Sequence, residues 1–148
     1  MIKEQIIELC RAYLQEKQTS LQLIITDINE ATHTETKSTA GDKHETGRAM
    51  MQLEQEKLNK QLADIQQQIT EFNKIDFSKI SNRIALGSLI ETDKGYYLIA
   101  SAIGKLTIEL KNIFVISPQS PLGIAFKGYS KDETVSFNQT AYKIVAVA

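Results

Sequence analysis

The fold is decided by residues 2–32, IKEQIIELCRAYLQEKQTSLQLIITDINEAT, and residues 46–73, TGRAMMQLEQEKLNKQLADIQQQITEFN. In the first stretch an apolar residue recurs every seven positions, at Ile7, Leu14, Leu21 and Ile28, and a weaker series follows three positions later, at Cys10, Lys17, Ile24 and Ala31. The second stretch repeats the pattern at Met51, Leu58, Ile65 and Phe72, with Leu62 and Ile69 at the complementary offset. Such repeats predict two α-helices that pair as a coiled coil.

The segment between the two stretches, about residues 33–44, determines how they pair. It is short and rich in Thr, Ser, Gly and charged residues, which favours a turn that folds the second helix back on the first. We therefore expect an antiparallel hairpin within one chain, with arms of roughly 40–45 Å at 1.5 Å rise per residue. The alternative is a coiled coil between two chains, for which only about four heptads are available.

The pattern changes to β type near residue 75. Residues 74–83 lose the heptad and read as a linker. Six short apolar runs follow, at residues 84–92, 96–102, 106–110, 113–116, 134–137 and 142–147. These runs predict about six strands, with tight turns at Asp93-Lys94-Gly95 and Asn138-Gln139. Within Ser120–Gly128, a Ser cap, a Pro in the first turn and a closing Gly predict one short helix.

The sequence therefore predicts an α+β protein with two domains. Residues 1–75 form an antiparallel coiled-coil hairpin, and residues 76–148 form a small antiparallel β-sheet domain with one short helix. The helix junction carries two acidic residues, so the hairpin has acid at its tip. A long helical arm with an acidic tip is suited to reaching into another molecule.

Composition and charge narrow the function classes. The net charge of −1 is divided unevenly, because residues 1–75 carry 9 basic and 12 acidic side chains, whereas residues 76–148 carry 8 and 6. Without a basic run, nonspecific binding to a nucleic-acid duplex is disfavoured, and a folded protein is the expected partner. An intramolecular hairpin predicts a monomer. We expect the protein in the cytoplasm, because the chain shows neither a secretory pattern nor an apolar run long enough to span a membrane. The single Cys10 excludes an internal disulfide.

The β-rich half resembles a known family. Residues 116–128, ISPQSPLGIAFKG, and residues 131–135, KDETV, are similar to the C-terminal domain of the Gre-type transcript-cleavage factors of bacterial transcription elongation. The resemblance implies an FKBP-like fold and RNA polymerase as the partner. It also implies a set of partner-binding residues, Ser117, Ser120, Pro121, Leu122 and Gly123.

The hairpin tip carries the second part of the resemblance. Residues 41–45 read Gly-Asp-Lys-His-Glu and match the Gly-Asp-x-x-Glu motif at the tip of the Gre coiled coil. The family resemblance implies that the hairpin enters the polymerase secondary channel and stimulates cleavage of backtracked RNA, meeting the RNA 3′ end indirectly. The sequence departs from the family just beyond the motif, where Thr46-Gly47-Arg48 replaces an Asn and an acidic-aromatic pair.

Asp42 and Glu45 are the candidate catalytic and metal-binding residues. Magnesium prefers oxygen ligands and retains several waters, so two carboxylates three positions apart can anchor it within a site completed by the polymerase. The ion would bind weakly to this chain alone, and the chain would be an accessory factor rather than an enzyme. The same spacing is also typical of a helix capping box, in which Asp42 accepts backbone N–H bonds and Glu45 reaches back.

Three further functions remain open. A noncleaving regulator or inhibitor of RNA polymerase is favoured by the departure at residues 46–48. A prolyl isomerase is conceivable on an FKBP-like fold. The aromatic residues that could line its pocket are expected in the sheet core instead, namely Tyr96, Tyr97, Phe114, Phe126 and Phe137. A coiled-coil scaffold with a β-rich appendage would form a stable dimer.

His33 and His44 have no common metal-ligand spacing and are expected to be solvated. Cys10 is expected to be a small core residue.

Overall fold

The computed structural model describes residues 2–37 and 42–148, and for residues 32–37 and 42–46 it describes the backbone alone. The chain packs into two compact units. We call Arg11–Thr70 the hairpin unit, and Met1–Cys10 together with Glu71–Ala148 the sheet unit. The predicted domain boundary after residue 75 stays a prediction, because compact packing does not establish which segments fold alone. Within the described residues, no helix is both long enough and apolar enough to cross a membrane.

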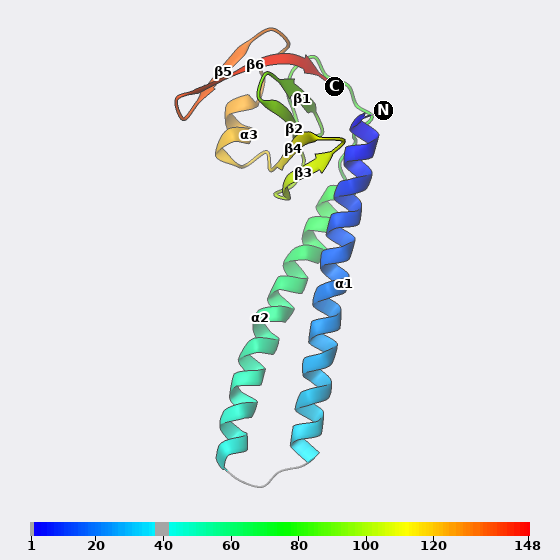
Figure 1. Ribbon diagram of the computed structural model, residues 1–148, viewed down its shortest axis with the longest axis vertical. Helices are drawn as coiled ribbons and strands as arrows, with labels where there is room; N and C mark the ends of the chain where they lie inside the picture. The colour runs from blue at the N-terminus through cyan, green and yellow to red at the C-terminus, as the bar shows by residue number, and fades with distance from the viewer. Residues whose placement is uncertain (1, 38–41) are drawn as a thin grey trace. The chain divides into compact units, whose positions relative to one another are not determined.

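Two long helices account for most of the first half of the chain. Helix α1 spans Ile2–Lys37 and helix α2 spans Asp42–Asn73. In the hairpin unit they run side by side in opposite directions (Figure 1). Leu14, Leu58 and Ile65 are buried in this unit, at the positions that the seven-residue repeats predicted. The antiparallel hairpin within one chain is therefore confirmed.

The second row of the α1 seam differs from the prediction. Lys17 and Ile24 are exposed, whereas Gln18 and Ile25 are half-buried. The spacing in α1 after Leu14 therefore alternates between four and three residues. A helix has 3.6 residues per turn, so a companion row three or four positions later is equally possible until a partner helix selects one. Farther along the pair, the Gln55 side-chain amide donates a hydrogen bond of 2.6 Å to the Asn29 side-chain oxygen.

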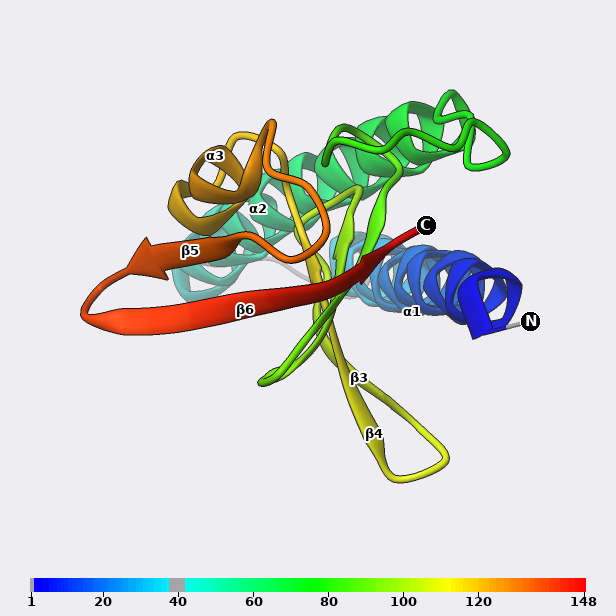
Figure 2. The same ribbon diagram turned by 90° about the horizontal axis from the view of Figure 1, so that it is seen from above.

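The sheet unit contains six strands and one short helix. The strands are β1 (Leu89–Thr92), β2 (Gly95–Ile99), β3 (Gly104–Ile108), β4 (Lys111–Ile116), β5 (Thr134–Phe137) and β6 (Thr140–Val147). Their order across the sheet is β3-β4-β2-β1-β6-β5. Helix α3 spans Pro121–Phe126 and packs near β5 (Figure 2). The predicted turns at Asp93-Lys94 and Asn138-Gln139 are confirmed, since each joins two antiparallel strands.

The sheet is mixed, which corrects the prediction of a purely antiparallel one. Strand β4 pairs in parallel with β2, in the register Tyr97 to Phe114 and Leu98 to Val115, and every other strand pair is antiparallel. After β2 the chain forms β3 at the sheet edge and returns as β4 in the interior. The central place of β4 follows from its apolar residues, because Ile113 and Val115 are fully buried. Strand direction depends on this long-range placement.

An aromatic core fills the face of the sheet that α3 covers. Tyr97 and Phe126 pack with ring centroids 5.3 Å apart, and Tyr142 contacts both rings edge-on. Ile90, Ile144 and other apolar side chains complete the cluster. Burial raises the pKa of the Tyr97 hydroxyl to about 12, with a smaller contribution from Tyr142. The expectation of an aromatic sheet core is confirmed for Tyr97 and Phe126, against which Phe114 packs. Tyr96 and Phe137 are half-buried and lie outside this cluster.

Candidate functional site

The first candidate site lies where the two long helices meet. Helix α1 ends at Lys37 and α2 begins at Asp42, so positions 42 and 45 belong to the first turn of α2. Positions three apart share one side of a helix. The side chains of Asp42 and Glu45 lie outside the described residues, so metal binding and helix capping both stay predictions. Among the residues that the structure describes, no group of three or more His, Cys, Asp or Glu side chains could hold a metal ion.

The residues after the tip motif continue α2. Gly47 is half-buried and Arg48 is exposed, and both are helical. A glycine inside a helix costs about 1 kcal/mol relative to alanine. Arg48 thus places an exposed positive charge in α2, three positions after Glu45 in the sequence.

The second candidate site is the turn that leads into α3. The Ser120 side chain caps the helix, because its hydroxyl oxygen accepts a hydrogen bond of 3.1 Å from the Gly123 backbone N–H. The same hydroxyl donates to the Ser117 carbonyl over 2.6 Å. The Ser117 hydroxyl accepts from the Gln119 backbone N–H and donates to the Gln119 side chain. These groups hold the turn in one conformation.

Gly123 allows this turn to pack tightly against α3. A Cβ atom at position 123 would overlap the carbonyl oxygen of Ser117, and it would approach the Ser120 hydroxyl to 2.9 Å and the Pro118 Cα to 3.2 Å. The glycine of the Ser-Pro-Leu-Gly sequence is therefore required for packing in this fold, apart from its similarity to the Gre family. Leu122 packs against the sheet core. Four of the five predicted partner-binding residues therefore have roles within the fold, namely Ser117, Ser120, Leu122 and Gly123.

The remaining exposed apolar surface of α3 comes from Pro121 and Ile124. Pro121 is exposed, and Ile124 is 62% exposed although it is surrounded in sequence by residues that face the core. Ile124 is not among the residues predicted to bind a partner. The helical spacing could have predicted its exposure. Leu122 and Phe126 are four positions apart and share the buried side of α3, so Ile124, two positions from each, lies on the other side. Which partner these residues meet stays a prediction.

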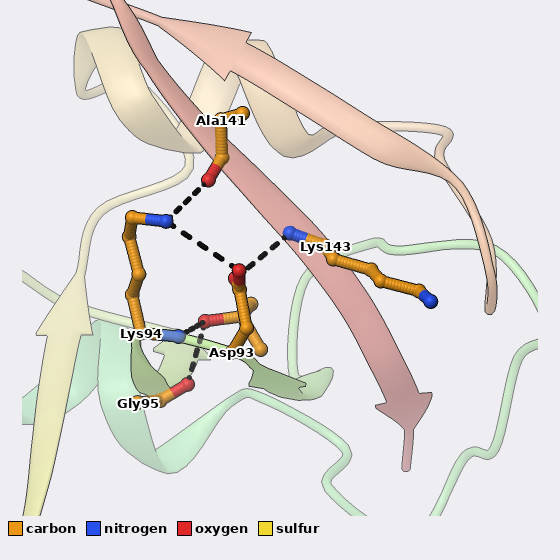
Figure 3. A network of polar contacts seen from close by, with 6 residues as sticks. Asp93, Lys94, Gly95, Ala141 and Lys143 are labelled. Carbon is orange, nitrogen blue, oxygen red and sulfur yellow. Dashed lines mark hydrogen bonds and ion pairs between the residues drawn. The ribbon is translucent and has the colours of Figure 1, made fainter.

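A polar network fixes β6 against the turn between β1 and β2 (Figure 3). The Asp93 carboxylate accepts a hydrogen bond of 2.9 Å from the Lys143 backbone N–H, and the Asp93 N–H donates to the Lys143 carbonyl over 3.1 Å. The Lys94 ammonium donates to the Ala141 carbonyl over 2.7 Å. The pairing of β1 with β6 shifts register between Glu91 and Thr92, so Asp93 restores the connection beyond this irregularity. The network is structural.

Cys10 lies in the apolar core of the sheet unit. It is fully buried, and burial raises the pKa of its thiol to about 12. A thiol with this pKa is protonated near neutral pH and therefore unreactive. The expectation that Cys10 is a small core residue is confirmed.

Comparisons with known proteins give a weak structural likeness and no match in sequence. No protein-family model matches this chain, and no curated protein matches it. The chain is similar to the solved structure of the transcription factor Gfh1 over 93% of this chain and 92% of that chain. The identity is 14% and the TM-score is 0.39, values too low to define a family.

Proposed function

We propose that this chain is a Gre-like transcription elongation factor that binds RNA polymerase and extends its helical hairpin into the secondary channel. The observation that carries the proposal is the position of the acidic motif at the junction of two long helices, since α2 begins at Asp42. Helices of 36 and 32 residues are about 54 and 48 Å long at 1.5 Å per residue. That length would deliver the tip deep into a channel, and the factor would act in the cytoplasm with the polymerase.

The tip acts through its two carboxylates. Asp42 and Glu45 supply oxygen ligands from the first turn of α2, and the polymerase supplies the rest of the site. A second Mg²⁺ ion held there would activate water for cleavage of the backtracked RNA. The chain thus completes the active site of another enzyme and meets the RNA 3′ end only through it.

The sheet unit provides the docking surface. Ser117, Ser120 and Gly123 build the turn that presents α3, and Pro121 and Ile124 offer its exposed apolar side to the polymerase. The same arrangement would suit the FKBP-like domain of the Gre family. A prolyl isomerase is a remote alternative, because Tyr97 and Phe126 are packed against other aromatic rings.

A noncleaving regulator of polymerase is the second candidate function. Gly47 and Arg48 follow the motif directly in α2, and Arg48 is exposed. Arg48 lies three positions after Glu45, and a guanidinium close to a carboxylate competes with a metal ion for its oxygens. Such a factor would occupy the secondary channel without promoting cleavage.

The decisive experiment is RNA cleavage in backtracked elongation complexes of the cognate polymerase. The wild-type chain is expected to accelerate cleavage, and Asp42→Asn and Glu45→Gln are expected to lose the acceleration while still binding polymerase. Asp64→Asn, which removes an exposed carboxylate from the middle of α2, is the matched control and should behave as wild type. Binding without acceleration would support the noncleaving regulator. Absence of binding would overturn both functions.

A further inference from the structure

A glutamine interrupts the apolar seam that α2 presents to α1. One series of buried and half-buried residues recurs along α2 at alternating intervals of four and three positions, at Met51, Gln55, Leu58, Leu62, Ile65, Ile69 and Phe72. Every member of this series is apolar except Gln55. A polar side chain at a seam position lowers the stability of a coiled coil and specifies the register in which its helices pair.

The Gln55 amide has its partner on the other helix. Its Nε2 group donates a hydrogen bond of 2.6 Å to Oδ1 of Asn29, 26 positions earlier in the chain. Asn29 is exposed and directly follows Ile28, a half-buried residue of the α1 seam. Both partners belong to the hairpin unit. The bond therefore joins a seam position of α2 to the flank of the α1 seam.

The apolar residues near this bond are covered less completely than those farther along the seam. Ile25, Ile28 and Met51 are half-buried, whereas Leu14 and Leu58 are buried. Apolar side chains make no directional contacts, so a repeated apolar seam can also pair after one helix slides along the other.

The hydrogen bond distinguishes between such registers. If α2 slid by one turn toward Ile25, Oδ1 of Asn29 would be out of reach of Gln55. The glutamine amide would then lie among apolar side chains, which is unfavourable for an unpaired donor. The pairing of Gln55 with Asn29 therefore favours one register in this part of the hairpin.

The acidic motif lies beyond this bond in the same helix. Asp42 precedes Gln55 in α2 by about 20 Å at 1.5 Å per residue. A slip of one turn would move Asp42 and Glu45 along α1 by about 5.4 Å. A displacement of about 1 Å is enough to slow a positioned reaction by up to about 100-fold.

We propose that Gln55 and Asn29 are positioning residues, which hold α2 in one register on α1 and thereby place the carboxylates of Asp42 and Glu45 for metal binding in the polymerase. This inference rests on the proposed function. Neither residue touches the reacting atoms. The seam glutamine lowers the stability of the hairpin and in return specifies where its tip lies.

Two measurements on the full chain test the inference. Electron spin resonance distances between labels at Leu23→Cys and Leu53→Cys report the register, because these exposed positions lie on different helices. Cys10 is buried and the pKa of its thiol is raised to about 12, so it is expected to stay unlabelled. Cleavage of backtracked RNA by the cognate polymerase, at saturating concentrations of the chain, reports the placement of the tip.

Gln55→Leu is expected to melt at the same temperature as wild type or higher, because leucine suits an apolar seam. Its label distances are expected to gain a second maximum, and its cleavage rate to fall about tenfold or more. The amide exchange Asn29→Gln with Gln55→Asn is expected to restore both readouts. Gln52→Leu, at an exposed position of α2, is the matched control and should leave both unchanged.

Label distances that Gln55→Leu leaves unchanged would overturn the inference and leave the proposed function standing. Unchanged cleavage by a Gln55→Leu chain whose distances shift would do the same. A lower melting temperature of Gln55→Leu, with unchanged label distances, would show that the pair only stabilises the hairpin. Absence of accelerated cleavage with the wild-type chain would overturn both the inference and the cleavage function.

Discussion

At Gly123 a hydrogen atom stands where every other amino acid places a carbon. Gly123→Ala is expected to lower the free energy of unfolding by about 1–3 kcal/mol, because the added methyl group overlaps the Ser117 carbonyl that the Ser120 N–H and hydroxyl both hold in place. Urea denaturation of the variant and of Ile124→Ala, an exposed control in the same helix, would measure the difference. An unchanged midpoint for Gly123→Ala would show that the turn can move aside.

Asp93 gives a residue-scale prediction about acid stability. The hydrogen bond from the Lys143 backbone N–H holds the pKa of the Asp93 carboxyl below its ordinary value of 3.8. A group whose pKa is lower in the folded chain contributes stability that is complete above the unfolded pKa and is lost as the pH falls through the folded pKa. Asp93→Asn is therefore expected to reduce stability at neutral pH and to flatten its decline below about pH 4. Denaturant midpoints measured across that range would check it, and an unaltered acid decline would contradict it.

At the scale of an element, the hairpin depends on its buried seam. Leu58→Ala and Ile65→Ala are each expected to cost about 2–5 kcal/mol, because both side chains are less than one-tenth exposed and their loss leaves cavities between the helices. Leu53→Ala, at a position 66% exposed on the same helix, is the matched control and is expected to change stability by less than about 0.5 kcal/mol. Circular dichroism at 222 nm during thermal unfolding would report on the helices. Equal effects at all three positions would contradict this seam.

For the whole molecule, pairing of α1 with α2 inside one chain predicts a monomer. Leu14, Leu58 and Ile65 are already buried within one chain, so a second chain gains little by pairing with the same seam. Sedimentation equilibrium is expected to give a mass of 16.6 kDa that does not change with concentration. A mass that rises with concentration would favour the coiled-coil scaffold and an interface outside the seam.

The sequence by itself determined the features that depend on neighbours along the chain. The repeat at Leu14, Leu58 and Ile65 fixed two helices with a common buried side, and Asn138-Gln139 fixed a tight hairpin, because periodicity and turn preference act over a few residues. The Ser120 cap was likewise predictable, and the structure supplies its partner in the Gly123 N–H. The resemblance at residues 41–45 identified the tip, and the role of its carboxylates awaits the cleavage experiment.

Only the tertiary structure decided the features that depend on distant segments. It placed β4 beside β2 in parallel, because an apolar strand reads the same in either direction until its neighbours bury it. It selected Gln18 and Ile25 for the seam in place of Lys17 and Ile24, because a helix repeat permits both until a partner helix packs against one. It also determined that Ile124 and Leu110 are exposed, because the exposure of a side chain depends on whether distant segments pack against it.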